Sequence, residues 1–302
     1  MRIVFLGTPE FAVPTLEGLA RTRGIEVVAA VCQPDRPAGR RGEVRAPAVK
    51  LAAERLGVAV HQPERLRGAE AVAWLEAQRP EALAVVAFGQ LLPAAIFNLP
   101  RLGAINAHAS LLPAYRGAAP MQWAIALGET KTGVTTMRIN AGLDTGDMLL
   151  QHAVEIGPKE TMPELSRRLA EVAAELMVAT FGGLEAGTIR PRPQPAEGTL
   201  APMLRRADGR IQPQWTARDI YNRWRGFQPW PGIYLEHEGK RLAVLDCQLG
   251  QTGAAAAASS LRFASGTLTL ACAAGTALAL DTVRLEGRQA MSGAEFARGA
   301  RL

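Results

Sequence analysis

Short apolar runs alternate with helical patterns through the first third of the chain, and this alternation limits the possible folds more than any other feature of the sequence. Residues 2–6, 25–32 and 82–89 consist mostly of Val, Ile, Leu, Ala and Phe. Between them, residues 46–57 and 69–78 carry apolar side chains at helical spacing. Apolar strands separated by helices are typical of a parallel sheet with both faces covered. We therefore expect a Rossmann-like α/β region whose ligands bind beyond the carboxyl ends of its strands.

This region continues with a strand pair and a long helix. Residues 132–139 and 146–156 are two further apolar runs, and they predict a pair of strands. Residues 161–186 predict a helix, which Thr161 opens with Glu164 three residues later, as in a capping box.

A proline-rich segment separates this region from a second, smaller one. Residues 188–203 contain four prolines and almost no periodic pattern, which is typical of a stiff linker. After it, a helical pattern at 216–226 is followed by short alternating runs broken by glycine, which predict a small OB-like β-barrel. We therefore expect a first domain at 1–187, a linker at 188–206 and a second domain at 207–302.

The composition argues against several classes of protein. Hydrophobic residues make up 48% of the 302 residues, and no apolar run is long enough to cross a membrane. Only four apolar residues stand in a row before Gly7, too few for a signal peptide, so we expect a cytoplasmic protein. The three cysteines are odd in number and far apart, and the four histidines are scattered, so neither disulfides nor a metal site is expected. The turn at Gly7 also lacks the further glycines of a dinucleotide site.

The net charge of +6 is concentrated in the last third of the chain. Residues 1–203 hold 21 basic and 20 acidic side chains, a balance of +1, whereas residues 204–302 hold 13 and 8, a balance of +5. A basic module fits an anionic partner such as RNA, because the binding of phosphates releases counterions. An ordinary solvated surface with the same surplus is the alternative.

The stretch INAHASLLPAYRGAAP at 105–120 contains the best candidates for catalysis. In an extended strand, Asn106 and His108 project from the same face, at the edge of the sheet where ligands bind. A histidine can transfer protons near neutral pH, and an asparagine amide can donate to an oxygen on which negative charge develops. The pair therefore suits acyl transfer through a tetrahedral intermediate. A buried histidine with a purely structural hydrogen bond is the alternative.

This stretch lacks an evident nucleophile and a carboxylate. It contains no Gly-x-Ser-x-Gly elbow and Ser110 has no obvious base, so the attacking group is expected to belong to the substrate. The loop NAGLDTGDML at 140–149 offers the carboxylate. Asp144 is the preferred partner of His108, because Asp147 leads into the next strand and could simply cap the turn.

Together these residues resemble the active site of the folate-dependent formyltransferase family. The shared pattern is Asn106-x-His108-x-Ser110-Leu-Leu-Pro113, followed by Leu143-Asp144-x-Gly146. Members of the family transfer a formyl group from 10-formyltetrahydrofolate to an amine. The resemblance implies that Asn106 and His108 stabilise the oxyanion and that Asp144 tunes His108 and assists proton transfer to the departing folate nitrogen. It implies no metal.

The resemblance also implies two walls for the folate pocket. The segments 88–93 and 110–113 match those that line the donor site in the family. Their contacts are expected to be made largely through backbone and apolar groups, with plain core packing as the alternative for the leucines. The candidate residues are Phe88, Gln90, Leu91, Leu92, Ser110, Leu111, Leu112 and Pro113.

Similarity to a narrower group extends over nearly the whole chain and is carried by TPEFAVPTLEGL, QPDRPAGR, VVAFGQLLP, YRGAAPMQWAI, GLDTGDML and FQPWPGIY. These segments resemble the members of the family that act on initiator methionyl-tRNA. Residues 34–50 hold five basic residues in a segment that we expect to be structureless, and they resemble the loop that enters the acceptor stem of the tRNA. Arg40 stands where the family keeps an arginine, whereas the residues after it depart from the usual lysine-rich pattern.

The predicted helix of the second domain offers further basic residues. Ile220, Trp224 and Phe227 have helical spacing and are expected to pack, while Arg223 and Arg225 are expected to face outward and touch phosphate. The candidate tRNA contacts are Arg36, Arg40, Arg41, Arg45, Arg223 and Arg225.

Other activities remain open at this stage. Formylation of an aminosugar nucleotide, or hydrolysis of the formyl-folate, would use the same Asn-His-Asp site, and an RNA-binding protein could retain a degenerate catalytic domain. The basic segment at 34–50 and the basic last third argue against the first two. The presence of Asn106, His108 and Asp144 argues against the third. We expect a monomer.

Overall fold

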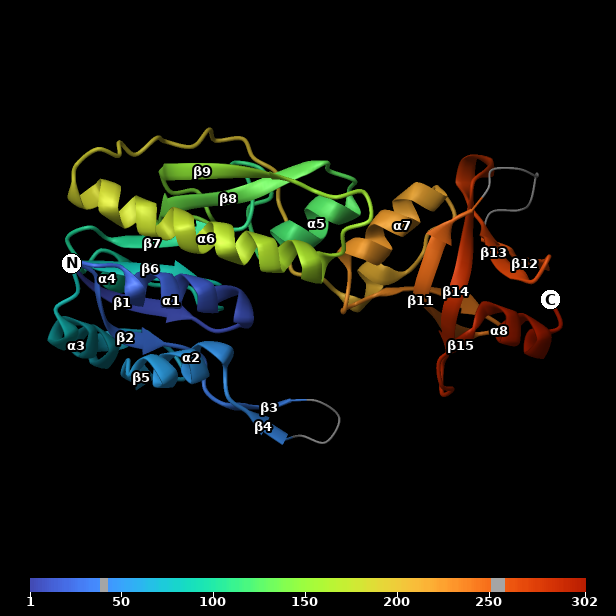
Figure 1. The fold of residues 1–302 in the computed structure, drawn as a ribbon, viewed down its shortest axis with the longest axis horizontal. Helices are drawn as coiled ribbons and strands as arrows, with labels where there is room; N and C mark the ends of the chain where they lie inside the picture. The colour runs from blue at the N-terminus through green and yellow to red at the C-terminus, as the bar shows by residue number, and fades with distance from the viewer. Residues whose placement is uncertain (39–42, 251–258) are drawn as a thin grey trace. The chain divides into compact units, whose positions relative to one another are not determined.

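The structure, a computed structural model, describes residues 1–38, 43–250 and 259–302 (Figure 1). The chain forms two compact units that do not correspond to a single cut in the sequence. The N-terminal unit comprises residues 1–120, 131–155 and 166–201, and the C-terminal unit comprises residues 121–130, 156–165 and 202–302. Within the described ranges, no helix is long and apolar enough to cross a membrane.

A seven-stranded mixed sheet forms the centre of the N-terminal unit. Its order is β5-β2-β1-β6-β7-β8-β9, in which the first five strands run parallel and the last two continue the sheet antiparallel. The strands are β1 (Arg2–Gly7), β2 (Glu26–Val31), β5 (Val60–His61), β6 (Ala82–Val86), β7 (Ala104–His108), β8 (Lys131–Arg138) and β9 (Met148–Glu155). The predicted Rossmann-like sheet is confirmed, and the predicted strand pair extends it.

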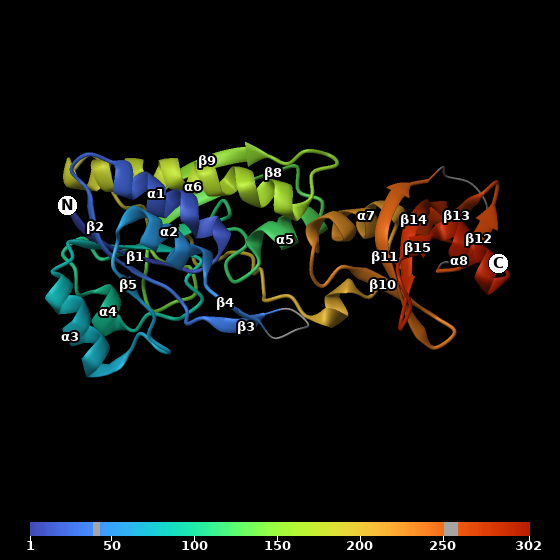
Figure 2. The same ribbon diagram turned by 60° about the horizontal axis from the view of Figure 1, so that its bottom comes forward.

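Helices cover both faces of this sheet, with α1, α2 and α6 over one face and α3 and α4 over the other (Figure 2). Because both faces are covered, the central strands are apolar throughout, and every residue of β6 is buried. The predicted start of the long helix is confirmed: the backbone N and Oγ1 of Thr161 donate to Oε2 of Glu164 at 2.8 and 2.7 Å. The helices are α1 (Val13–Arg21), α2 (Ala48–Leu56), α3 (Gly68–Gln78), α4 (Ala94–Phe97) and α6 (Met162–Glu185).

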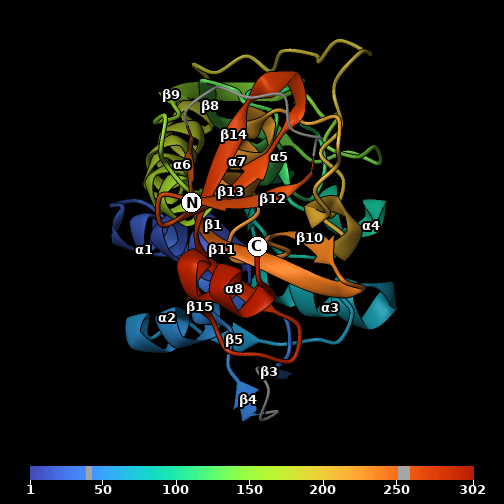
Figure 3. The ribbon, with the colours of Figure 1, turned by 90° about the vertical axis from the view of Figure 1, so that its right-hand side faces the viewer.

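An antiparallel sheet forms the centre of the C-terminal unit, and Figure 3 shows its curl. Its order is β10-β11-β14-β13-β12, with β15 paired to β14, while α8 contacts β13 and β14 and α7 contacts β11. The predicted β domain and the helix that precedes it are therefore confirmed. The elements are α5 (Pro120–Ala126), α7 (Ala217–Gly226), β10 (Ile233–His237), β11 (Lys240–Leu249), β12 (Leu261–Ala264), β13 (Thr267–Ala271), β14 (Ala277–Leu285), β15 (Met291–Ser292) and α8 (Gly293–Ala300).

The basic segment at 34–50 contains regular structure. Strands β3 (Arg36–Ala38) and β4 (Glu43–Arg45) pair antiparallel as a two-stranded ribbon, with Arg36 opposite Arg45. The prediction of a structureless segment is therefore wrong, because the two extended flanks satisfy each other's backbone groups. The predicted contacts Arg40 and Arg41 lie outside the described residues.

The proline-rich segment packs along the N-terminal unit through backbone hydrogen bonds. Arg192 and Met148 exchange two bonds of 2.8 Å each. Further along, the backbone N of Arg116 donates to Thr199 at 2.8 Å, and the N of Ala201 donates to Arg116 at 2.7 Å. Since prolines carry no N–H, the residues between them make these bonds. Up to residue 201 the segment is thus a packed part of the N-terminal unit.

Candidate active site

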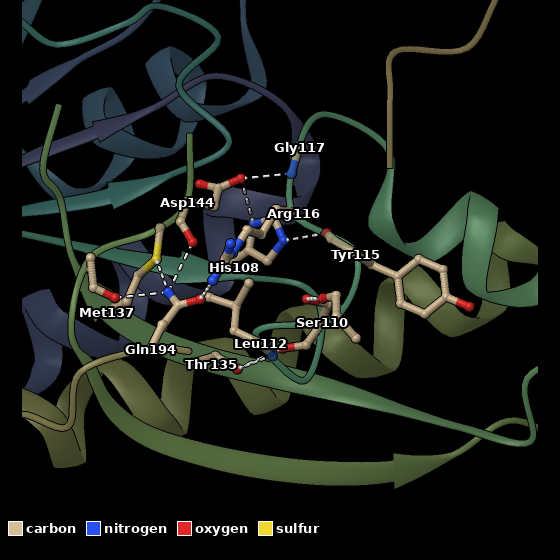
Figure 4. Close-up of polar contacts among 12 residues, drawn as sticks. His108, Ser110, Leu112, Tyr115, Arg116, Gly117, Thr135, Met137, Asp144 and Gln194 are labelled. Atoms are coloured by element: carbon tan, nitrogen blue, oxygen red, sulfur yellow. Dashed lines mark hydrogen bonds and ion pairs between the residues drawn. The ribbon is translucent and has the colours of Figure 1, made fainter. Parts of the chain in front are cut away.

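The end of β7 and the segments beside it build the candidate site. β6 and β7 are adjacent parallel strands, so the residues that follow them lie at the same edge of the sheet. Asn106 and His108 stand two positions apart on β7 and face the same side. The loop at 139–147, which follows β8, brings Asp144 to His108 (Figure 4). The structure therefore brings together two of the three predicted catalytic side chains in direct contact.

His108 is held at both ring nitrogens (Figure 4). Its Nε2 lies 2.9 Å from the carbonyl oxygen of Tyr115, and its Nδ1 lies 3.5 Å from Oδ2 of Asp144. A carbonyl only accepts, so Nε2 carries the proton of the neutral ring, an assignment made from the hydrogen-bond network. Nδ1 is then the nitrogen that can take up a second proton, directly opposite a carboxylate. The imidazole is 6% exposed.

Asp144 is oriented by the backbone of the same turn that contacts His108. Its Oδ2 accepts a hydrogen bond of 2.8 Å from the backbone N of Gly117. Its φ of +50° lies in the left-handed region, which Asp tolerates better than most residues. Gly146 permits the tight return of the loop, because a Cβ there would overlap the carbonyl oxygen of Arg138. The carboxylate is 17% exposed and thus partly reachable by a ligand.

Asn106 leaves its amide available for a ligand. The side chain is half-buried, and among the residues that the structure describes none hydrogen-bonds to it. An amide of this kind donates readily to a carbonyl oxygen placed beside it. Of the predicted catalytic residues, Asn106 therefore offers a donor without breaking an existing bond, whereas His108 is already paired at both nitrogens.

The segment 110–113 turns its alternate side chains into the protein. Ser110 is fully buried and its Oγ donates to the carbonyl of Ala114 at 2.6 Å, while Leu112 is 3% exposed. Thr135 supports the turn, since its Oγ1 donates to the carbonyl of Ser110 at 2.7 Å and accepts from the N of Leu112 at 3.1 Å. Leu111 and Pro113 are half-buried. Of this predicted wall, only the latter two expose side chains to a ligand.

The segment that follows β6 shows a similar division. Phe88 is 2% exposed within the core, and its carbonyl accepts hydrogen bonds from Thr8 and Gln33. Gln90 is occupied by the backbone, since its Oε1 accepts a bond of 2.8 Å from the N of Leu66. Leu91 is 89% exposed and Leu92 is half-buried, so these two are the apolar side chains that the segment presents.

Two predicted tRNA contacts lie in the exposed ribbon. Arg36 and Arg45 face each other in register, and both side chains are exposed. Nη2 of Arg36 lies 3.4 Å from Oε2 of Glu64, an exposed pair that contributes little stability. The root of the ribbon is braced by Lys50, whose Nζ donates to Asp35 at 2.7 Å. The hydrogen bonds from Gln62 and Lys50 lower the pKa of the Asp35 carboxyl.

Arg225 does not face outward as predicted. It is 4% exposed, and its Nη1 donates to the carbonyls of Gly157 and Glu160 at 3.1 and 2.9 Å. Its Nη2 donates to Oδ1 of Asn222 at 2.8 Å. The prediction is wrong because residues 156–165 of the same unit cover this side of α7, which helical spacing within α7 could not indicate. Burial also lowers the pKa of its guanidinium.

Arg223 is half-buried rather than free in solvent. Its guanidinium lies 3.9 Å from the centre of the Trp215 ring, and its Nη1 donates to the carbonyl of Asp219 at 3.2 Å. Burial lowers the pKa of this guanidinium as well. Ile220 and Phe227 are buried as predicted, whereas Trp224 is half-buried, with its ring stacked on Tyr221.

The described residues do not offer a metal site or an activated thiol. No three His, Cys, Asp or Glu side chains gather as ligands within these ranges. The cysteines Cys32, Cys247 and Cys272 are free and buried. Burial raises the pKa of the Cys32 and Cys272 thiols to about 11 each, so neither is a thiolate at neutral pH.

Sequence reasoning missed the groups that hold the catalytic pair. The carbonyl of Tyr115 and the N–H of Gly117 are backbone groups, and backbone groups leave no signature in residue types. It also missed Arg116 between them, a buried arginine that is 7% exposed, and Gln194, to which its guanidinium donates. An arginine inside an otherwise apolar stretch was the one available signal.

Comparisons with known proteins cover both units of the chain. The profile described as formyl transferase matches residues 1–181, and that described as formyl transferase, C-terminal domain, matches residues 203–301. A methionyl-tRNA formyltransferase of Acidobacterium capsulatum is 50% identical over 301 residues, which cover 99% of this chain and 96% of the relative. A methionyl-tRNA formyltransferase of Solibacter usitatus is 50% identical over 303 residues, which cover 100% and 96%.

A solved structure with the same fold extends this comparison. It is the crystal structure of WlaRD, a sugar 3N-formyl transferase, in the presence of dTDP and 5-N-formyl-THF. The TM-score is 0.66 and the sequence identity 14%, over 96% of this chain and 99% of that one. At this identity the likeness concerns the fold alone.

Proposed function

Because this chain belongs to the formyl transferase family, we propose that it transfers the formyl group of 10-formyltetrahydrofolate to the amino group of initiator methionyl-tRNA. The observation that carries the proposal is the 50% identity, over nearly the whole chain, to relatives named for this activity. The paired His108 and Asp144 beside a free Asn106 amide are the chemistry that such a transfer needs.

The first step is attack of the methionine amine on the formyl carbon. The carbonyl becomes an oxyanion, and the Asn106 amide donates a hydrogen bond to it, which lowers the barrier because the bond strengthens as charge develops. The amine nitrogen gains a positive charge in the same step and must lose a proton. No protein nucleophile takes part, in agreement with the buried, protonated thiols of the described cysteines.

The second step is collapse of the tetrahedral intermediate. The carbon–nitrogen bond to the folate breaks, and the departing folate nitrogen takes up the proton that the amine has lost. His108 carries this proton, and the carboxylate of Asp144 stabilises the imidazolium formed in passing. Since Nδ1 faces Asp144, His108 reaches the substrate through Nε2 once the bond to Tyr115 is broken. The neutral ring then carries its single proton on Nδ1, towards the carboxylate of Asp144, so that Nε2 can accept the proton of the amine and pass it to the folate nitrogen.

The residues available for the donor fit a flat, largely apolar ring system. Leu91, Leu92, Leu111 and Pro113 present apolar surface on two segments at the same sheet edge. The other predicted residues support these two segments from inside the protein, because their side chains are buried or bonded to the backbone. They are Ser110, Leu112, Phe88 and Gln90. We assign the donor pocket to these two segments.

The tRNA is bound by exposed basic residues. Arg36 and Arg45 of the ribbon contact phosphates of the acceptor stem, together with Arg40 and Arg41. The domain at 207–302 adds further phosphate contacts through its basic surplus, while the domain at 1–187 carries out catalysis. We also propose that the enzyme acts as a monomer in the cytoplasm.

A formyl-transfer assay with alternative acceptors tests the proposal. The purified chain is given 10-formyltetrahydrofolate and, in parallel, initiator methionyl-tRNA, elongator methionyl-tRNA or an aminosugar nucleotide. We expect rapid formylation of the initiator tRNA only. Preferred formylation of the aminosugar nucleotide, or release of formate without an acceptor, would replace this function by one of its alternatives.

A further inference from the structure

Residues 194–201 are connected to the catalytic pair by the turn at 115–117. The two backbone groups that hold His108 and Asp144 belong to Tyr115 and Gly117, the neighbours of Arg116. Oγ1 of Thr199 accepts a bond of 2.8 Å from the N of Tyr115. The backbone of Arg116 bonds to the same segment on both sides, at 2.8 and 2.7 Å. The position of this turn therefore depends on residues 194–201.

The side chain of Arg116 makes the second connection. Arg116 is 7% exposed, and none of the described carboxylates pairs with its guanidinium. Nε and Nη2 donate to Oε1 of Gln194 at 3.1 and 2.8 Å, Nη2 also donates to the carbonyl of Pro195 at 2.8 Å, and Nη1 to that of Ala196 at 3.3 Å. A buried arginine satisfied only by neutral acceptors of one segment locks that segment in place.

Gln194 carries the connection on to the catalytic loop (Figure 4). Its Nε2 donates to the carbonyls of Asp144 and Gly146, at 2.9 and 2.7 Å. Both N–H groups of the amide are thus used on the two residues that flank Thr145. The orientation of the amide is fixed, because only Oε1 can accept from Arg116 and only the NH₂ group can donate to two carbonyls.

We propose that residues 194–201 form a positioning element for the catalytic pair, in which Gln194 and Arg116 hold the loop of Asp144 against His108. This inference rests on the proposed function, since it assigns the segment to the same site. Among the described residues, only Gln194 donates a hydrogen bond to the carbonyls of Asp144 and Gly146 from outside the loop. Without these two bonds the carboxylate drifts from His108, and a displacement of about 1 Å in a catalytic group can cost about a hundredfold in rate.

The test compares two substitutions of Gln194 with a control in the same segment. Gln194→Glu keeps an acceptor for Arg116 but loses both N–H donors, whereas Gln194→Ala loses every bond. We expect both to lower kcat by about 10- to 100-fold with little change in the KM of either substrate. The control is Glu197→Gln, an exposed side chain with no hydrogen bond among the described residues, and it should leave kcat unchanged.

The outcomes separate positioning from other roles. If Gln194→Glu has the same kcat as the wild-type chain, the glutamine serves only as the acceptor of Arg116, and the inference is wrong. A raised KM for the tRNA with unchanged kcat would make the segment a tRNA contact instead. The double variant Arg116→Lys with Gln194→Ala should lose no more than Gln194→Ala alone, because Arg116 acts on the loop through Gln194. Additive losses would contradict this.

Hydrogen exchange separates this inference from the proposed function. Amides at 140–147 should exchange faster in both Gln194 variants than in the wild-type chain, at equal melting temperature. Unchanged exchange would overturn the inference even in an active enzyme. If the wild-type chain formylates no tRNA, the proposed function fails while the exchange result still decides whether the segment holds the loop.

Discussion

Replacement of Asp144 by asparagine separates the charge of the catalytic carboxylate from its shape. Oδ2 is the atom that faces both Nδ1 of His108, at 3.5 Å, and the N–H of Gly117, at 2.8 Å. An asparagine can place its carbonyl oxygen there and keep the bond to Gly117, because that bond needs only an acceptor. Asp144→Asn therefore preserves the loop and removes the negative charge opposite the imidazole.

The expected loss follows from the distance. Two unit charges 3.5 Å apart interact by about 1 kcal/mol in a medium like water and by about 5 kcal/mol at an effective dielectric constant of about 20. With the two side chains 6% and 17% exposed, the pair lies between these limits, so we take about 3 kcal/mol. This energy is lost where the imidazolium forms, in the transition state, and corresponds to a fall of about a hundredfold in kcat.

The assay is single-turnover formylation of methionyl-tRNA, compared among the wild-type chain, Asp144→Asn and Asp144→Ala. We expect both variants to bind tRNA and folate as the wild-type chain does, with Asp144→Ala at least as slow as Asp144→Asn because it also leaves the N–H of Gly117 without its acceptor. If Asp144→Asn turns over within threefold of the wild-type rate, the charge is not needed. If only Asp144→Ala is then slow, the residue acts by holding Gly117, and the reasoning from charge is refuted.

Four further outcomes are expected. Asn106→Ala should lower kcat by about 10²- to 10³-fold, the cost of losing one oxyanion donor, with unchanged folate affinity in a fluorescence titration; a wild-type rate would remove Asn106 from the site. Arg45→Ala should weaken tRNA binding and reduce the slope of log K against log salt by about one, measured by filter binding; an unchanged slope would mean that this side chain touches no phosphate. Gly146→Ala should lower the melting temperature and kcat together, because its Cβ overlaps a carbonyl oxygen; normal values for both would show that the loop can relax. The lowered pKa of Asp35 means that its bonds stabilise the fold above the ordinary carboxyl range and that this contribution is lost as the pH falls through the lowered pKa. Asp35→Asn should therefore flatten the acid side of the stability curve, and an identical curve for the variant would contradict the link.

Much of the fold could be predicted from local pattern alone. The apolar run at 82–89 contains β6, which is buried on both faces, and the pairing of Thr161 with Glu164 marked the start of α6. Such features are visible in sequence because burial on both faces of a sheet, or a cap at a helix end, constrains residues close together in the chain. The ribbon within the basic segment at 34–50 could not be predicted in this way, because its strands are three residues long and not apolar.

The residue types of the candidate site came from the sequence, whereas their contacts depended on the tertiary structure. Asn106 and His108 share a strand, so their common side follows from the alternation of side chains. Asp144 meets His108 only because a loop after an antiparallel strand returns to it, and Gln194 reaches that loop from a segment that reads as a linker. Arg225 shows the reverse: helical spacing placed it outside, but distant residues of the same unit cover it. Local periodicity determines which face a side chain takes, but what lies against that face is decided by chain topology.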